Sequence, residues 1–369
     1  MGVSALEHGD TAVRFSWNEV TGAIGDSVTV LPIVVGVSAL SDLSLSWMLL
    51  WFGVFQIVWG LYYGVPISVE PMKALGGLVI AGALTVDELL LAGLILGVVL
   101  LAIGTTGWLA HVERYVPGSV VRGIQFGVAL LLFETGFRLG IGDPFLGLLA
   151  TGFALALVAS GRWNVTALAI LAVGGLIAGM HSGVPEPTLP PTASLFDLTS
   201  LDLTISTVEA AAAQFAMTVG NAALAASILL KDYFDRDVSA DQLSQSMGVM
   251  NLIALPFGAF PMCHGSGGIA GKYAFGARTA GANVVLGMFY VGAAVFAVGL
   301  VTAYPTAVLG VVLALVALQL GRTSLEKAGT APLVVGIGVL GVLVNLGAAF
   351  VVGIFAANLL ERYDPGILR

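Results

Sequence analysis

The residues best suited to chemistry lie in two hydrophobic segments that are broken by glycine and proline. The first, residues 65–77, reads VPISVEPMKALGG, and the second, residues 260–271, reads FPMCHGSGGIAG. Pro66 and Pro261 are 195 positions apart. Proline lacks an N–H donor and disfavours helix before it, so each segment predicts an extended stretch followed by a short helix. Helix starts attract anions, and paired broken segments point to the substrate site of a secondary transporter.

The candidate substrate ligands surround these two breaks. Lys73 would lie in the first turn of the first short helix, where an ammonium at membrane depth needs a partner such as Glu70 or a bound anion. Glycines at the second break would let a ligand approach the backbone. The predicted substrate-binding residues are Glu70, Met72, Lys73, Ala74, His264, Ser266, Gly267 and Gly268, with Asp26, Asn221 and Gln125 from neighbouring segments.

Three of these residues, Glu70, Asp26 and His264, are also candidates for proton coupling. Each polar residue has a structural alternative. Glu70 and Lys73 could form an ion pair that only stabilises the bend, and Asp26 could bond Asn221 or a backbone N–H. His264 could be a satisfied buried histidine, and Gln125 could bond a neighbouring helix. These alternatives stay open on the sequence alone.

The elements that must position these residues are membrane spans. The chain has 369 residues, of which 58% are hydrophobic and only 10% are charged, against about 25% charged in soluble domains. This composition predicts an all-α polytopic membrane protein, since a span needs about 20 mainly apolar residues. Gly, Pro and charged residues divide the chain into fourteen segments: 19–40, 44–64, 65–83, 86–104, 117–138, 143–160, 163–181, 204–230, 240–259, 260–276, 281–303, 304–321, 330–345 and 346–361.

The Lys and Arg residues predict the orientation. With the N-terminus inside, Arg138 is the basic residue on the outer side, Lys73 falls within the membrane, and the others lie inside, as the positive-inside rule predicts. The predicted inner residues are Arg14, Arg114, Arg122, Arg162, Lys231, Arg236, Lys272, Arg278, Arg322, Lys327, Arg362 and Arg369. Glu134 is expected to pair with Arg138 at i+4. Both termini are therefore predicted to be cytoplasmic in a multi-pass cell-membrane protein.

Composition also excludes several functions. A single cysteine, Cys263, excludes an intrachain disulfide and argues against a cysteine-based metal cluster. The four histidines are widely spaced, which predicts no metal site, and no cofactor is expected. The chain has no basic patch for nucleic acid and no Ser/His/Asp or paired-ligand arrangement, so we predict neither a nucleic-acid partner nor an enzyme.

The 195-residue offset extends beyond the two prolines. Residues 24–26 (Ile-Gly-Asp) correspond to residues 219–221 (Val-Gly-Asn), and Gly53 corresponds to Gly248. Seven segments per half is an odd number, so the second half enters the membrane from the opposite side. The pattern therefore predicts a 7+7 inverted repeat with extended stretches before half-helices 3 and 10.

Three runs carry a family resemblance: NEVTGAIGD at residues 18–26, the segment of residues 66–77, and FGAFPMCHGSGGIAGKYAFGAR at residues 257–278. They resemble the molybdate transporter family, a branch of the sulfate permease superfamily. The resemblance implies a core and a gate domain, substrate between segments 3 and 10, alternating access, and homodimers through the gate. Glu70 departs from this family, which usually has Gln there. The cation that relatives carry at the position of Gly268 is matched here by Lys73, 195 positions earlier.

The predicted domain organisation follows from this resemblance. It assigns a cytoplasmic N-terminus to 1–18, core to 19–104, gate to 105–181, an external linker to 182–203, core to 204–303, gate to 304–361 and a cytoplasmic C-terminus to 362–369. We therefore expect a secondary transporter of a tetrahedral oxyanion, molybdate first and sulfate second, coupled to protons and surrounded by membrane lipid. A nucleobase permease of the same fold and an uncoupled anion channel are the alternatives.

Overall fold

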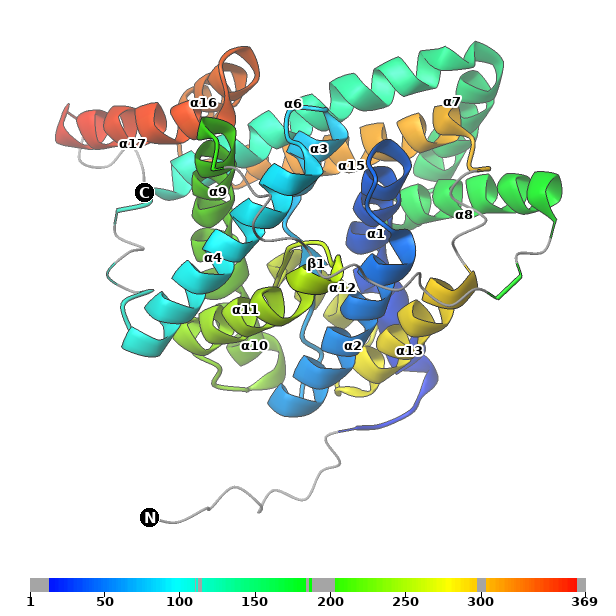
Figure 1. Ribbon diagram of the computed structural model, residues 1–369, viewed down its shortest axis with the longest axis horizontal. Coiled ribbons are helices and arrows are strands. Elements are labelled where there is room, and N and C mark those ends of the chain that lie inside the picture. The colour runs from blue at the N-terminus through cyan, green and yellow to red at the C-terminus, as the bar shows by residue number, and fades with distance from the viewer. Residues whose placement is uncertain are drawn as a thin grey trace.

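The chain is an all-helical membrane protein (Figure 1). The computed structural model describes residues 13–109, 111, 115–183, 186–187, 203–296 and 303–363. Most of the predicted linker 182–203, the end residues 1–12 and 364–369, and the predicted inner residues Arg114 and Arg369 lie outside the described residues. Six described helices are long and apolar enough to cross a membrane, and the bent α1 would be a seventh.

Each predicted segment contains a described helix. In the first half these are α1 (Trp17–Leu40), α2 (Leu45–Tyr63), α3 (Lys73–Ile80), α4 (Val86–Thr106), α6 (Gly118–Gly142), α7 (Pro144–Ala159) and α8 (Trp163–Ser182). In the second half they are α9 (Ile205–Met217), the π-helix η2 (Thr218–Leu224), α10 (Ala225–Phe234), α11 (Ala240–Ala254), the 3₁₀ turn η3 (Leu255–Phe257), α12 (Ser266–Ala274), α13 (Gly281–Phe296), α15 (Thr306–Glu326), α16 (Ala331–Leu343) and α17 (Leu346–Tyr363).

Some predicted bounds were wrong, and local chemistry explains the differences. The twelfth segment was predicted to end at 321, but α15 continues to Glu326 because Arg322 and Glu326 pair at i+4, with 2.6 Å between Nε and Oε1. The eighth segment is three consecutive helical pieces and ends at Phe234, where Asp235 adopts a left-handed conformation with φ of 50°. Helix α1 is bent by 44°, since Pro32 removes the hydrogen bond to the carbonyl four residues earlier.

The two broken segments cross near the middle of the molecule (Figure 1). Strand β1 (Glu70–Pro71) pairs antiparallel with β2 (Met262–Cys263), and Glu70 lies opposite Cys263. The Met72 N–H extends this pairing by donating to the Pro261 carbonyl at 2.9 Å. Backbone without helix is tolerated at membrane depth only when it is buried in protein or lines a cavity. The crossing meets that condition, since Glu70, Met262 and Cys263 are buried.

Two amides at equivalent positions hold the extended stretches in place. Gln56 of α2 donates to the Val69 carbonyl at 3.2 Å. Asn251 of α11 donates to the Met262 carbonyl at 2.7 Å and accepts from the Met262 N–H at 2.8 Å. Gln56 and Asn251 are 195 positions apart. The offset therefore relates hydrogen-bonding roles as well as residue types.

Close helix packing through glycine also occurs at equivalent positions in the two halves. Helix α2 packs on α13 through Gly53, where an added Cβ would meet the Gly287 carbonyl. Helix α11 packs on α4 through Gly248, where an added Cβ would meet the Gly97 carbonyl and Leu101. Small residues let helix backbones approach closely in lipid. These contacts agree with the predicted correspondence of Gly53 and Gly248.

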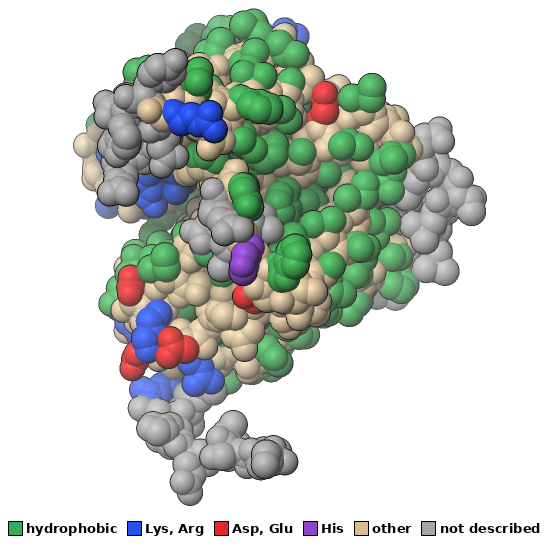
Figure 2. All heavy atoms as spheres, turned by 90° about the vertical axis from the view of Figure 1, so that its left-hand side faces the viewer, with side chains coloured by type: hydrophobic (Ala, Val, Ile, Leu, Met, Phe, Trp, Pro, Cys, Tyr) green, Lys and Arg blue, Asp and Glu red, His purple; other side chains and the backbone are tan. Residues whose placement is uncertain are grey.

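Helices α6 and α15 form a second packing unit above the crossing in Figure 1. They meet at Gly136 and Gly310, where added Cβ atoms would each overlap the partner's backbone. Helices α7, α8, α16 and α17 pack around this pair. In Figure 2, most Lys and Arg side chains lie on one side of the visible face, whereas the other side is largely apolar, as expected for a protein in lipid.

Candidate functional site

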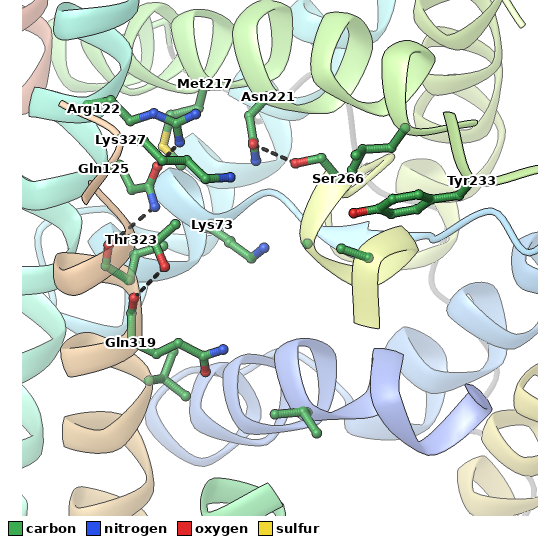
Figure 3. Close-up of a pocket in the computed structure, with 16 residues that line it drawn as sticks. Lys73, Arg122, Gln125, Met217, Asn221, Tyr233, Ser266, Gln319, Thr323 and Lys327 are labelled. Carbon is green, nitrogen blue, oxygen red and sulfur yellow. Dashed lines mark hydrogen bonds between the residues drawn. The ribbon is translucent and has the colours of Figure 1, made fainter. Parts of the chain in front are cut away.

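A cavity of about 200 Å³ lies between the crossing and the α6–α15 pair. Residues of α1, α3, α9, η2, α10 and α12 line one part of the cavity, and residues of α6 and α15 line the opposite wall. Figure 3 shows Lys73 pointing into this space, with Ser266 on one side and Gln125 and Gln319 on the other. The volume leaves room for one small oxyanion with some water.

The cavity lining is basic. Lys73, Arg122 and Lys327 all contribute, and none of the described residues that line the cavity is Asp or Glu. Lys73 has a side chain that is only 15% exposed, whereas Lys327 at the end of α15 is exposed. The positive charge therefore extends from the surface to the crossing. Such an arrangement attracts and retains anions.

Neutral donors complete the lining. Ser266 donates to the Asn221 side-chain oxygen at 2.7 Å, as the dashed line in Figure 3 marks. Gln125 accepts from Arg122 at 2.9 Å and donates to the Leu320 carbonyl at 3.2 Å. Gln125 thus lines the cavity and also joins α6 to α15. Both roles considered for this residue, cavity lining and a bond to a neighbouring helix, are present. Asn221 lies on the π-helix η2, and π-helical turns occur often at functional sites.

At the start of α12 the protein supplies its own anion. The Gly268 N–H donates to Glu70 Oε1 at 2.6 Å, and the Lys73 ammonium pairs with Glu70 Oε2. The expected Glu70–Lys73 pair is therefore present. An added Cβ on Gly265 or Gly268 would overlap the Glu70 carboxylate. The glycines of the second break make room for this carboxylate.

Asp26 has different partners from those predicted. Its carboxylate accepts from Ser68 at 2.5 Å and from Gln56 at 2.7 Å, and it pairs with Lys272 at 3.1 Å. The alternative of a bond between Asp26 and Asn221 stays a prediction, and the side-chain oxygen of Asn221 accepts from Ser266 on α12. Asp26 is fully buried and belongs to a charged network beside the cavity.

Lys272 was predicted to lie on the inner side, and this prediction was wrong. Its ammonium is fully buried and donates to Gln56 Oε1 at 2.9 Å, to Asn283 Oδ1 at 3.0 Å and to the Ile67 carbonyl. A buried ammonium requires such compensation. Lys272 follows a half-helix start by only a few residues, and that position was the available signal for its burial.

The start of α3 has a neutral partner. The Ala74 N–H donates to Gln214 Oε1 at 2.9 Å, and the Gln214 amide nitrogen donates to Thr218 at 3.0 Å. The backbone N–H groups of Met72, Ala74 and Gly268, which were predicted as substrate ligands, thus all have protein partners in this structure.

His264 is held between two elements. Its Nδ1 lies 2.9 Å from the Ser68 carbonyl, and its Nε2 lies 2.7 Å from Ser246 Oγ. The histidine is fully buried and does not line the cavity. This arrangement matches the alternative of a satisfied buried histidine.

The predicted site residues therefore divide into two groups. Those that line the cavity are Lys73, Gln125, Asn221, Ser266 and Gly267, and those behind it are Asp26, Glu70, Met72, Ala74, His264 and Gly268. Sequence reasoning did not identify Arg122, Gln319, Thr323 and Lys327 as cavity residues. They belong to α6 and α15, and no motif indicates that these helices face the crossing.

Comparison of the sequence with known proteins identifies molybdate transporters as relatives. A family described as "Molybdate transporter of MFS superfamily" matches residues 18–132 and again residues 206–320, once in each half. Molybdate transporter 2 of Arabidopsis thaliana is 29% identical over 83% of this chain and 78% of its own length.

Solved structures show the fold. The transmembrane domain of the cyanobacterial bicarbonate transporter BicA superposes with a TM-score of 0.69 at 18% identity, covering 90% of this chain and 97% of that one. SLC26A9 superposes with a TM-score of 0.64 at 13% identity, covering 94% of this chain and 65% of that one. The arrangement of helices around the crossing is thus one that known transporters share.

Proposed function

Since the chain belongs to the molybdate transporter family, we propose that it is a secondary transporter of a tetrahedral oxyanion, with molybdate as the first candidate and sulfate as the second. The observation that carries this proposal is the cavity lined by Lys73, Arg122 and Lys327 and by none of the described acidic residues. A buried cavity with this lining stabilises a compact dianion more than a neutral solute.

Transport would follow alternating access. Helices α1–α4 and α9–α13 would act as the core that holds substrate, and α6–α8 with α15–α17 as the gate. The matching roles of Gln56 and Asn251 support a 7+7 inverted repeat of fourteen segments. Arg122 and Lys327 border the cavity at the side predicted to be cytoplasmic, which supports an inward-open arrangement. Homodimers would form through the gate, in the cell membrane.

Proton coupling is part of the proposal. A dianion entering a buried site needs compensating charge, and a buried carboxyl that gains a proton supplies one unit of it. Glu70, Asp26 and His264 lie next to the cavity and are the candidates, although none of them lines it. An uncoupled channel would show flux that neither saturates nor responds to a pH gradient.

Replacement of the central cation provides the test. In proteoliposomes, Lys73→Ala should reduce saturable molybdate uptake about ten- to hundredfold, because a charge-assisted hydrogen bond to the anion is lost. Lys231→Ala is the matched control, since Lys231 is exposed and pairs with Asp235 outside the cavity. Near-normal uptake by Lys73→Ala would overturn the assignment.

Competition by tungstate, sulfate and uracil identifies the substrate class. Uracil is included because a carboxylate, that of Glu70, lies at the start of α12, where a nucleobase permease would need one. Displacement of molybdate by tungstate and sulfate supports an oxyanion carrier. Displacement by uracil alone would instead favour the nucleobase alternative.

A further inference from the structure

Glu70 occupies donors that an incoming oxyanion needs. Its Oε1 accepts the Gly268 N–H at 2.6 Å, and its Oε2 pairs with the Lys73 ammonium, the central cation of the cavity. A backbone donor at a helix start and a lysine are groups that bind oxyanions in proteins. In this structure a carboxylate of the protein itself satisfies both.

The position of Glu70 is determined by several independent contacts. Its backbone lies in β1, opposite Cys263 of β2. Ser68 Oγ lies 3.3 Å from Glu70 Oε1 and 2.5 Å from Asp26 Oδ1, so it bridges the two acids. Gly265 and Gly268 have no side chain where the carboxylate lies, and an added Cβ at either position would overlap it. The site is therefore shaped around this carboxylate.

The buried charges next to the crossing balance one another, and the other two cations of the cavity, Arg122 and Lys327, lie farther from Glu70 on α6 and at the end of α15. Glu70 and Asp26 face Lys73 and Lys272, two acids and two bases, all on elements around the crossing. A bound dianion would add two negative charges to this buried group, which is costly. The titratable or charged groups on neighbouring elements whose charge acts on Glu70 include Lys73 of α3, Asp26 of α1, Cys263 of β2, His264 beside β2, Lys272 of α12 and Tyr290 of α13.

We infer that Glu70 is an internal substitute for the substrate, and that the oxyanion displaces it as the carboxyl takes up one proton. Uptake of that proton from water forms an O–H bond on Glu70 and converts the carboxylate to the neutral acid, and the Lys73 ammonium then pairs with the oxyanion. The protonated carboxyl gains a donor that can point to the anion. This inference rests on the proposed function and selects one of its three coupling candidates.

The other two candidates are engaged elsewhere. Asp26 stays paired with Lys272 and bonded to Gln56, away from the cavity lining. His264 bonds Ser68 and Ser246 through its two ring nitrogens. Glu70 differs from both because its direct partner Lys73 lines the cavity. An oxyanion that reaches Lys73 therefore competes with Glu70 first.

The measurement is the number of protons taken up for each molybdate bound. Isothermal titration calorimetry on the purified full chain, in two buffers of different ionisation enthalpy between pH 6.5 and 8, yields this number. We expect about one proton for the unaltered protein, and a molybdate affinity that rises by up to about tenfold for each unit fall in pH. Zero protons with measurable binding would overturn the inference.

Two variants sharpen the result. Glu70→Gln keeps the shape and an acceptor but cannot ionise, so it should bind molybdate with no linked proton and with a pH-independent affinity. Glu134→Gln is the matched control, because Glu134 is an exposed glutamate that pairs with Arg138 at 2.6 Å. A full proton retained in Glu70→Gln would overturn the inference. If Glu70→Gln does not fold, the proton number of the unaltered protein decides.

This experiment distinguishes a failure of the proposed function from a failure of the proposed role of Glu70. If the unaltered protein binds no molybdate at any pH, the proposed function fails. If it binds molybdate without a linked proton, the oxyanion assignment stands, whereas proton coupling at the binding step and the role of Glu70 fail. Proton-linked binding that persists in Glu134→Gln and vanishes in Glu70→Gln supports both.

Discussion

The starts of α3 and α12 occupy equivalent positions in the two halves, yet their chemistry differs. At α3 the Ala74 N–H meets the neutral amide of Gln214, and the helix itself carries Lys73. At α12 the Gly268 N–H meets the carboxylate of Glu70, and two glycines follow the first helical residue, Ser266. Both starts are connected by the β1–β2 pairing. The backbones of the two helix starts are thus nearly symmetric. The side chains at equivalent positions differ, and this difference sets the charge at each start.

The surroundings of the two starts differ as well. Lys272, buried in α12 and paired with Asp26, corresponds by the 195-residue offset to Gly77 of α3. Gly77 packs against Val128 of α6, where an added Cβ would overlap the valine side chain. A charged side chain at that position would collide with α6. At this position α12 carries a buried lysine, whereas α3 carries a glycine that packs against α6 of the proposed gate.

The largest expected effect is on stability, and it tests how much the buried Lys272–Asp26 ion pair stabilises the protein. Lys272→Met removes the ammonium and leaves Asp26 buried without that partner, which should destabilise the protein by about 3–5 kcal/mol. Thermal unfolding in detergent measures the loss. In the double variant Asp26→Asn with Lys272→Met, part of the stability should return, since no uncompensated carboxylate remains.

Lys231→Met is the control for this comparison. Lys231 lies 2.8 Å from Asp235 in an exposed pair, and such pairs contribute about 1 kcal/mol or less. An unchanged unfolding temperature in Lys272→Met would contradict the interpretation that the two starts differ in their dependence on buried charge.

The next effect tests the space for the carboxylates at the start of α12. Gly268→Ala would place a Cβ against Glu70, Asp26 and Ser68, and overpacking of this kind costs about 1–3 kcal/mol. Gly267→Ala is the matched control, because no atom lies within 4 Å of its added Cβ. Thermal unfolding of the two variants should separate them clearly. Equal unfolding temperatures would show that the carboxylates do not need this space.

The smallest expected effect on stability comes from replacing Gln214, the neutral partner of the α3 start. Gln214→Leu leaves the buried Ala74 N–H without its acceptor, which should cost about 1 kcal/mol or somewhat more. Gln214→Glu keeps an acceptor and adds a charge, so it makes the α3 start resemble the α12 start. We expect Gln214→Glu to unfold near the normal temperature and to bind molybdate about tenfold more weakly. Unchanged binding would show that the charge difference between the two starts is unimportant.

Much of the fold was predictable because apolar periodicity and Gly/Pro punctuation are local signals. The bounds of α1, α2, α7 and α8 agree with the predicted segments to within two residues, and the extended stretches lie at the expected prolines. The end of α15 was not predictable in the same way. Arg322 and Glu326 continue that helix because they pair with each other, whereas the segment was predicted to end at its last apolar residues.

The candidate site was only partly predictable. Lys73 and Ser266 could be predicted because they belong to recognisable breaks, and both line the cavity. Lys272 could not be placed correctly from its charge, since the sequence does not reveal that Asp26, Gln56 and Asn283 surround its ammonium. These partners come from α1, α2 and α13, which are far apart along the chain.

The sequence by itself determined the membrane class, the two broken segments and their correspondence at an offset of 195, because composition and proline chemistry act locally. The tertiary structure decided which groups meet at the crossing. It placed the Glu70 carboxylate at the start of α12 and Arg122 and Lys327 opposite Lys73. Electrostatic pairing depends on distance in space, and that distance exists only once helices from both halves have packed together.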